Sequence, residues 1–280
     1  MTELSGKRIV MTGATGFIGS HVAKRFLEAG AEVYCLVRPE SQKTDCLPVH
    51  EHLHRIPAQM DQAVECVPQI GHADAFLHFA WRGVNRQEID SPAVQKLNID
   101  GSLRCMEAAG LLGCQVFMDA GSRVEYGITA DGTMEESMEC HPVNEYGKAK
   151  LAFFEQAKQL CRELPEGKTV SLSACRHRWN FMDIEDASRA VVELYRYSDS
   201  HRGECHAVNV ASEDTRVLRD FVEEIHSLCG GSGNLEYGSF VQAKEGALSI
   251  CPVNENLRRL TGGTWKEQIS FAEGIRRMLG

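Results

Sequence analysis

The stretch KRIVMTGATGFIGSHVAKRFLEAGAEVYCLVR (7–38) decides the fold class of this chain. KRIVMTG (7–13) is a short β-branched run that ends in glycine, and HVAKRFLEAG (21–30) has apolar residues at helical spacing before a glycine stop. AEVYCLVR (31–38) is typical of a second strand. A strand–helix–strand unit of this length favours a parallel sheet with a right-handed crossover.

The alternation of strands and helices continues along the chain. The further predicted elements are a strand in 73–81, a helix over 91–113, a strand over 114–122, a helix over 146–160, strands in 169–174 and 203–211, and helices over 218–228 and 270–279. We therefore expect an α/β fold with a doubly wound parallel sheet of the Rossmann type and a smaller C-terminal substrate lobe. Residues 1–168 would form the dinucleotide-binding domain, and 169–280 a mixed region of small lobe and returning Rossmann elements.

Composition excludes several classes of function. The 280 residues are 43% hydrophobic and 25% charged, which is typical of a globular protein, and the net charge of −9 gives no basic surface for nucleic acid. The eleven cysteines stand singly without a CxxC spacing, which predicts thiols of a reducing compartment and no metal site. No apolar run approaches the length of a membrane span, so we expect a cytoplasmic protein without a membrane partner.

The glycines of TGATGFIGS (12–20) lie between the first strand and the first helix. Three glycines at this spacing can form a tight turn that binds no ligand. When they follow a strand and open a helix, they predict a dinucleotide site. Glycine lets the backbone approach a pyrophosphate, and the free N–H groups and dipole of the helix favour the anion. The cofactor-binding residues predicted from this loop are Gly13, Thr15, Gly16, Phe17, Ile18 and Gly19.

GxxGxxG spacing combined with a YxxxK further on resembles the extended short-chain dehydrogenase/reductase family, the NAD(P)-dependent sugar epimerase/dehydratase group. The resemblance covers most of the chain and includes HFAW (78–81), LNIDGSLRCMEAA (97–109), GSRVEYG (121–127), YGKAK (146–150), WNFMDIEDASRAV (179–191) and GGTWKEQISFAEGI (262–275). It implies that Phe79 and Ala80 lie beside the cofactor and that Asn98 lies in the helix below it. A purely structural role for Asn98 is an equal alternative.

Tyr146 and Lys150 stand four residues apart in a predicted helix, so their side chains share one face. A neighbouring ammonium favours the phenolate form, which suits an acid–base tyrosine. The resemblance implies that Lys150 also holds the nicotinamide ribose and that Ser122 donates a hydrogen bond to the reacting carbonyl. The alternatives are surface residues of an amphipathic helix for the pair and a strand-end cap for Ser122.

Four further side chains are weaker candidates for binding the substrate: Trp81, Arg82, Arg123 and Arg178. Arg178 lies in ACRHRWNF (174–181), which could bind a diphosphate or form a solvated loop. Arg38 follows the second predicted strand, where NAD-preferring relatives have an acidic residue that binds the ribose. With no carboxylate expected there, the sequence predicts NADP as cofactor, with NAD as the alternative.

The segment after Ser122 bears on the type of reaction. Dehydratases of the group carry an acidic pair there, whereas this chain has Arg123 and Val124, with Glu125 expected one place late on the other face of the strand. We therefore expect an NADP-dependent oxidoreductase that acts on a keto group of a nucleotide-sugar-like substrate (4-keto reductase type). The alternatives are an NAD(P)-dependent nucleotide-sugar epimerase and a non-catalytic NADP-binding regulatory protein. The resemblance leaves open a homodimer through helices 91–113 and 146–160.

One departure from the family concerns the chain after the predicted catalytic helix. QLCRELPEGKTVSLSACRHRWNF (159–181) passes from the helix to what resembles a later part of the substrate lobe. Either the lobe is reduced, or a segment near 160–168 is absent from the printed sequence. Because the loss of a central parallel strand would expose the core of the sheet, we expect an absent segment.

Overall fold

The computed structural model describes residues 3–41, 45–85, 87–129, 132–163, 168–174, 180–228 and 249–279. Its centre is a seven-stranded sheet in the order β3-β2-β1-β4-β5-β7-β8, in which neighbouring strands pair in parallel. The strands are β1 (Arg8–Thr12), β2 (Glu32–Val37), β3 (Leu53–Pro57), β4 (Ala75–His78), β5 (Val116–Gly121), β7 (Lys168–Ala174) and β8 (Cys205–Val210). The strand order reverses between β1 and β4, and at such a point the carboxyl ends of the strands open a ligand-binding crevice.

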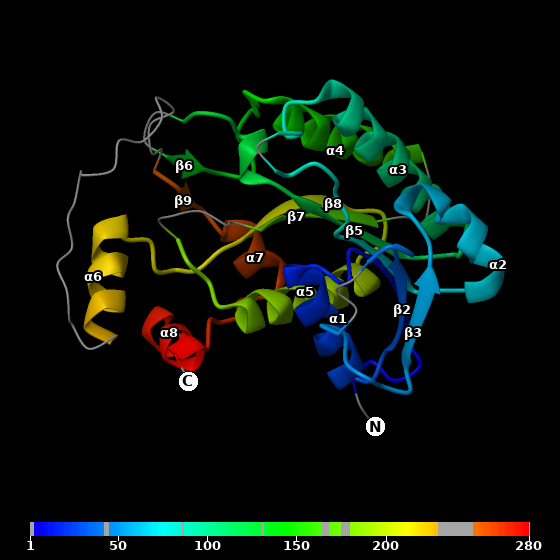
Figure 1. Ribbon diagram of the computed structural model, residues 1–280, viewed down its shortest axis with the longest axis horizontal. Helices are drawn as coiled ribbons and strands as arrows, with labels where there is room; N and C mark the ends of the chain where they lie inside the picture. Colours follow the sequence, from blue (N-terminus) through cyan, green and yellow to red (C-terminus); the bar gives the residue numbers. More distant parts are fainter. Residues whose placement is uncertain are drawn as a thin grey trace.

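Helices cover both faces of the sheet (Figure 1). One face carries α1 (Phe17–Glu28) and α5 (Ile184–Ser200), and the other carries α3 (Pro92–Leu111) and α4 (Glu145–Glu163). Between β3 and β4 lie the 3₁₀ turns η1 (Met60–Gln62) and η2 (Val64–Cys66) and the short α2 (Val67–Ile70). The predicted doubly wound parallel fold is therefore confirmed.

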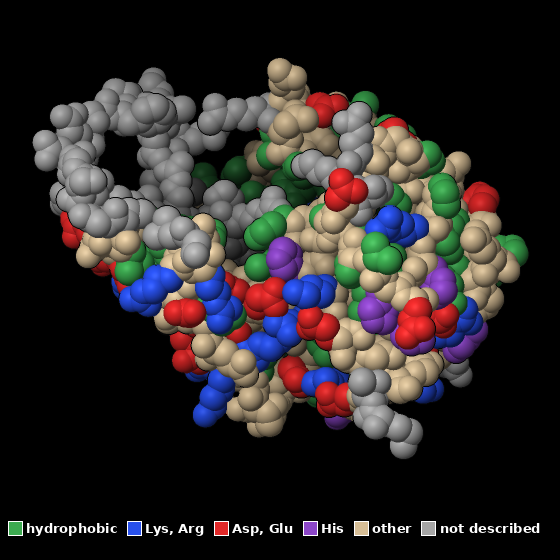
Figure 2. Space-filling view, turned by 60° about the horizontal axis from the view of Figure 1, so that its bottom comes forward, with side chains coloured by type: hydrophobic (Ala, Val, Ile, Leu, Met, Phe, Trp, Pro, Cys, Tyr) green, Lys and Arg blue, Asp and Glu red, His purple; other side chains and the backbone are tan. Residues whose placement is uncertain are grey.

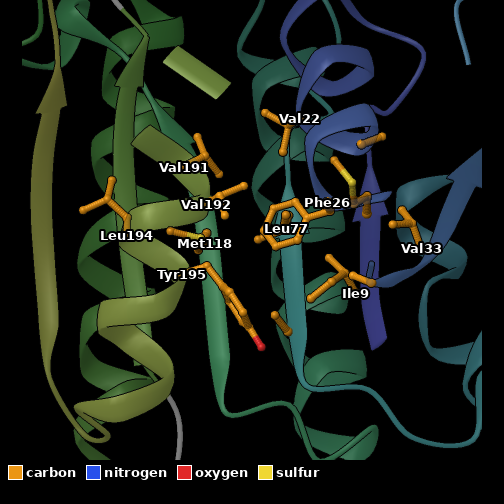
Figure 3. Packing of buried hydrophobic residues seen from close by; sticks show 14 of the residues in the cluster. Ile9, Val22, Phe26, Val33, Leu77, Met118, Val191, Val192, Leu194 and Tyr195 are labelled. Carbon is orange, nitrogen blue, oxygen red and sulfur yellow. The ribbon is translucent and has the colours of Figure 1, made fainter. Parts of the chain in front are cut away.

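The core consists of two apolar clusters, one on each face, because successive residues of a strand point to opposite faces. In β1, Ile9 and Met11 belong to the cluster under α1 and α5, whereas Val10 belongs to the cluster under α3 and α4. Figure 3 shows Phe26 of α1 and Tyr195 of α5 over the sheet, and their rings meet edge to face at 5.5 Å. Buried on both sides, the strands read as nearly continuous hydrophobic runs, and their alternation is lost from the sequence.

A small second sheet joins the middle of the chain to its C-terminal part, in which the described residues form three helices. β6 (Thr133–Met134) pairs in parallel with β9 (Cys251–Pro252), and the helices are α6 (Leu218–Leu228), α7 (Glu255–Leu260) and α8 (Phe271–Leu279). The rings of Phe221 in α6 and Phe271 in α8 lie 4.6 Å apart, which pairs these two helices beside the sheet (Figure 1). None of the helices in the described part of the chain has the length and apolar composition to cross a bilayer.

The strand after α4 bears on the expected absent segment. β7 pairs with β5 on one side and with β8 on the other. The chain itself therefore supplies the strand between β5 and β8, and the sheet has no gap there. The physical reason for expecting an absent segment was therefore wrong. The absent segment was expected near residues 160–168, and of these 164–167 lie outside the described residues. The proposed domain boundary at residue 168 falls at the first residue of β7, inside the common sheet.

Candidate active site

The glycine loop packs against the chain that follows β4. Gly13 has φ +68°, and a Cβ added to it would lie 2.5 Å from the carbonyl carbon of Phe79 and 2.6 Å from the nitrogen of Ala80. A Cβ on Gly19 would lie 2.3 Å from the Gly13 carbonyl oxygen. Two backbone segments therefore approach more closely than any side chain would allow, which is a physical reason for glycine at 13 and 19.

The first turn of α1 fits an anionic ligand. Gly16 is its N-cap, no side chain caps this end, and the first turn contains no acidic residue. Thr15 precedes the cap, Phe17 is 60% exposed, and Ile18 is half-buried. The uncapped N-terminus of a 12-residue helix is a site where backbone N–H groups and the helix dipole favour a phosphate. These residues therefore fit the diphosphate of a dinucleotide.

A buried hydrogen-bond chain fixes the end of β4. Ser102 Oγ donates to the Asn98 carbonyl oxygen at 2.7 Å, so it accepts from Nε2–H of His78 at 2.8 Å. Nδ1 of His78 then accepts from the Thr12 hydroxyl at 2.7 Å. Burial lowers the pKa of His78 to about 3, with a smaller contribution from the Lys150 ammonium, which keeps the imidazole neutral.

Asn98 holds the loop that leaves β4. Its Oδ1 accepts from the Arg82 backbone N–H at 2.9 Å, and its Nδ2 donates to the Arg82 carbonyl oxygen at 2.9 Å and to Gln95 Oε1 at 3.1 Å. The fully buried amide is thus used by the protein. This geometry favours the structural alternative for Asn98, and a direct contact with a cofactor stays a prediction.

Lys150 lies at the carboxyl end of β5 with its side chain 4% exposed. Its Nζ donates to the Ala120 carbonyl oxygen at 2.7 Å and lies 3.6 Å from the Trp81 ring centroid. The ring of Tyr146 meets the same indole edge to face at a centroid distance of 6.0 Å. Trp81 therefore contacts both members of the predicted catalytic pair, and Tyr146 and Lys150 share the face of α4 that we expected.

Asp119 is a site residue that the sequence did not reveal. Its Oδ1 lies 3.7 Å from Lys150 Nζ, and its side chain is 2% exposed. Burial raises the pKa of Asp119, and the Lys150 ammonium opposes that shift. The one signal in the sequence was a carboxylate inside the apolar run CQVFMDAGS (114–122). A buried carboxylate needs a charged partner, but the sequence does not say that the partner is Lys150.

Ser122 and Glu125 form a reciprocal cap. Ser122 is the N-cap of the 3₁₀ turn η3 (Arg123–Glu125): Glu125 Oε1 accepts from the Ser122 backbone N–H, and Ser122 Oγ accepts from Val124 N–H at a long 3.4 Å. A Cβ on Gly147 would lie 2.8 Å from the Val124 carbonyl oxygen, so the first turn of α4 packs on η3. Ser122 and Tyr146 thus come from contacting elements.

The predicted place of Glu125 on the far face of a strand was wrong. β5 ends at Gly121, and the chain then turns as η3, which brings the carboxylate back to Ser122. Arg123 opens this turn beside Ser122. Arg178 falls outside the described residues, so its predicted role in substrate binding has no structural counterpart here.

Arg38 lies at the end of β2 with its side chain 57% exposed, and its Nη1 is 3.8 Å from Glu40 Oε1. Gln59 Nε2 donates to the Glu40 carboxylate at 3.0 Å, and Gln59 Oε1 accepts from Arg82 Nη2 at 2.6 Å. The expectation that this corner has no carboxylate was therefore wrong, because Glu40 follows the strand closely. The corner offers both a guanidinium for a phosphate and a carboxylate for a hydroxyl.

Two cavities border these residues. One, of about 690 Å³, is lined mainly by apolar side chains and reaches from Phe17 and Ile18 of α1 to Phe79, Ala120 and the C-terminal α8. Figure 2 shows a hollow with hydrophobic side chains in its depth. The other, of about 570 Å³, is lined by Ser122 and Glu125 together with residues of α4 and β8. Among the described residues, His, Cys, Asp and Glu side chains form no cluster that could hold a metal ion.

Comparisons with known proteins agree with this geometry. Residues 9–177 match the model of the NAD dependent epimerase/dehydratase family. UDP-glucose 4-epimerase 2 of Oryza sativa subsp. japonica is 25% identical over 179 positions, which are 59% of this chain and 43% of that protein. CDP-abequose synthase of Salmonella muenchen is 22% identical over 299 positions, which cover 98% of this chain and 97% of that protein.

The chain spans about half the length of the UDP-glucose 4-epimerases that it matches. Among solved structures, UDP-glucose-4-epimerase from Stenotrophomonas maltophila with bound NAD and formylated UDP-arabinopyranose superposes with a TM-score of 0.78. It is 15% identical, and the match covers 96% of both chains. At this identity the superposition supports the fold alone.

Proposed function

Because the chain belongs to the NAD-dependent epimerase/dehydratase family, we propose that it is an NADP-dependent oxidoreductase that acts on a keto group of a nucleotide-sugar-like substrate. The proposed reaction is of the 4-keto reductase type. The observation that carries it is the convergence at one sheet edge of three parts: the uncapped end of α1, the Ser122 turn and the α4 face with Tyr146 and Lys150.

Each of these parts has a separate task in the proposed reaction. The nicotinamide, when bound, supplies a hydride or accepts one. The Tyr146 hydroxyl donates a proton to the reacting oxygen and takes it back in the reverse direction, and Ser122 Oγ donates a hydrogen bond to the same oxygen. The Lys150 ammonium holds the ribose, and the first turn of α1 binds the diphosphate.

NADP is the proposed cofactor because of the end of β2. Arg38 is more than half exposed and its ion-pair partner Glu40 lies 3.8 Å away, so the guanidinium is accessible to a 2′-phosphate. Glu40 supports NAD as the alternative, since its carboxylate could accept from a ribose hydroxyl. A preference for NADP requires that the attraction of Arg38 for the 2′-phosphate exceed the repulsion from Glu40. The dissociation constants of NADPH and NADH measure this preference directly.

A nucleotide sugar is the proposed small-molecule partner. Two kinds of relative support this class: those named UDP-glucose 4-epimerase and the one named CDP-abequose synthase, which matches over almost the whole length of both chains. The relatives named epimerase favour the second candidate function, an NAD(P)-dependent nucleotide-sugar epimerase. A non-catalytic NADP-binding role is disfavoured by the retention of Ser122, Tyr146 and Lys150. A homodimer through α3 and α4 and a cytoplasmic location stay parts of the proposal.

The decisive experiment compares two reactions in the purified protein. One mixture contains NADPH and nucleoside-diphosphate 4-keto sugars, and the other contains NAD and UDP-glucose. Consumption of NADPH with formation of one equivalent of the nucleotide sugar that carries a C4 hydroxyl supports the reductase. Interconversion of UDP-glucose and UDP-galactose without net reduction of NAD would replace it by the epimerase.

Two variants on α4 test the proposed residues. Tyr146→Phe should lower turnover by orders of magnitude and leave the affinity for the cofactor nearly unchanged. Lys148→Ala is the matched control, because Lys148 is exposed on the same helix and pairs with Glu145 at 2.8 Å. Wild-type turnover in Tyr146→Phe would remove Tyr146 from the mechanism.

A further inference from the structure

Glu125 occupies a place between the proposed catalytic groups and a cavity. Its Oε1 accepts from the Ser122 backbone N–H, and the side chain forms part of the wall of the 570 Å³ cavity that Ser122 also lines. The electrostatic effect of the Lys150 ammonium reaches Glu125 from α4, and that of the Asp119 carboxylate reaches it from β5. The carboxyl group is thus bonded to the backbone of Ser122, and the Lys150 ammonium acts on it electrostatically.

We propose that Glu125 is a positioning residue of the active site, which holds the Ser122 turn through its carboxyl oxygen and controls, through its own charge state, the electrostatic potential at Ser122 and Lys150. The proposal deepens the proposed function and rests on it for the roles of Ser122 and Lys150. The predicted consequence is a pH dependence that belongs to Glu125 and acts through these neighbours.

Burial raises the pKa of Glu125 to about 7, against the Lys150 ammonium and the Ser122 N–H, which lower it, and with a smaller contribution from Asp119, which raises it. The carboxyl group therefore changes charge near neutral pH, whereas an ordinary glutamate is ionised there. The charged and titratable side chains that face it from its own turn and from neighbouring segments are Asp119, Arg123, Tyr126, Glu136, Glu139, Cys140, Lys150, Glu155 and His206.

The charge state matters because reduction of a carbonyl builds negative charge on its oxygen. With a neutral Glu125, Ser122 Oγ and the Lys150 ammonium stabilise that charge and the Tyr146 proton neutralises it. An ionised Glu125 adds a negative charge beside them and opposes the reduction. Reduction should therefore be faster below pH 7 than above it. The rate of oxidation in the reverse direction should increase as Glu125 ionises.

Glu125→Gln separates the charge from the cap. The glutamine side-chain oxygen can still accept from the Ser122 N–H, since a capping box is formed by glutamine as well as by glutamate. The variant removes only the ionisation and should fold as the wild type does. Glu139→Gln is the matched control, because Glu139 lines the same cavity but is 85% exposed at its rim.

The test uses ¹³C NMR titrations of the NADP-bound protein, with label in the glutamate carboxyl carbons and in the tyrosine ring carbons. In the wild type, one glutamate signal should titrate near pH 7, and the Tyr146 signal, assigned with Tyr146→Phe, should show an inflection at the same pH. Both effects should disappear in Glu125→Gln and persist in Glu139→Gln.

A Glu125 signal that titrates in the ordinary glutamate range, or a Tyr146 signal that is indifferent to Glu125→Gln, would overturn the proposal. The titration does not depend on turnover. If the protein reduced no nucleotide sugar, the proposed function would be refuted, but the titration of Glu125 and its effect on Tyr146 would still hold. Where turnover with a 4-keto sugar is found, the fall in reduction rate above pH 7 should be absent from Glu125→Gln.

Discussion

Replacement of Gly13 by alanine should damage the fold and the cofactor site together. The change adds one Cβ, which meets the backbone of Phe79 at 2.5 Å and of Ala80 at 2.6 Å. Neither partner atom is the mobile end of a side chain, so the loop after β4 has to move away from the glycine loop. Gly203 provides the matched control, because its φ is +81° and an added Cβ there meets nothing within 4 Å.

The expected magnitude has two parts. A left-handed backbone costs an L-residue about 1–2 kcal/mol relative to glycine, and both variants carry this cost. Overlap in a packed interior adds about 1–3 kcal/mol, and only Gly13→Ala carries it. Gly13→Ala should therefore lose about 2–5 kcal/mol of unfolding free energy, against about 1–2 kcal/mol for Gly203→Ala.

The assay is urea unfolding of both variants, followed by titration with NADPH. Each kcal/mol of difference corresponds to about 2–4 °C in Tm for a domain of comparable size, so thermal unfolding is an independent check. Gly13→Ala should bind NADPH much more weakly, and Gly203→Ala should bind it as the wild type does. Equal stabilities of the two variants, with wild-type NADPH affinity in Gly13→Ala, would refute the close approach of the two loops.

Three further predictions concern charges. Arg38→Ala should weaken the binding of NADPH far more than that of NADH. Glu40→Gln should shift the ratio of the two dissociation constants in the opposite direction. Equal losses of affinity for both cofactors in Arg38→Ala would contradict the preference for NADP. For His78, whose folded pKa of about 3 lies below the unfolded value, the unfolded state binds more protons between about pH 6.5 and 3, so stability should fall by about 4–5 kcal/mol as pH drops through that window. Denaturation of His78→Gln at several pH values checks this, since the variant should lack that decline. At 3.7 Å the Asp119–Lys150 attraction is about 4–5 kcal/mol at an effective dielectric constant of about 20, and the burial cost of the carboxylate opposes it. Both single variants leave one charge buried without its partner: Asp119→Asn leaves the Lys150 ammonium, which keeps the Ala120 carbonyl, and Lys150→Met leaves the carboxylate. In urea unfolding, Lys150→Met should cost about 3–5 kcal/mol and Asp119→Asn less.

The sequence predicts the sheet well where a strand is buried on both faces. β1 and β2 could be found because their apolar runs flank a helix with a glycine at each end. β3 was missed, because HEHLHRIP (50–57) combines three histidines and an arginine with few apolar residues. It is an edge strand, and within it only Ile56 is fully buried, so most of its positions face polar surroundings.

Site residues were predictable when local spacing determines their contacts. Tyr146 and Lys150 share a face because four residues are about one helical turn. The contacts of Asp119 and Glu125 depend instead on where β5 ends. The strand predicted from the sequence ran through residue 122 and so placed Glu125 on the wrong face. In the structure the chain turns after Gly121. The partner of Asp119 lies 31 positions further along, and no periodic pattern connects the two.

The loop from Phe79 to Arg82 joins the cofactor half of the site to the catalytic half. Its start packs on Gly13, the Trp81 ring lies 3.6 Å from Lys150 Nζ, and its end is bonded to Asn98 through both the N–H and the carbonyl of Arg82. A displacement at Gly13 therefore moves the indole that covers the lysine, because the loop between them is only a few residues long. The amide of Asn98 resists such movement, since a shift of Arg82 breaks two hydrogen bonds to a side chain that is fully buried. A polar residue buried in α3 thus serves the site through the loop it holds, which is why its side chain can matter for turnover without reaching the cofactor.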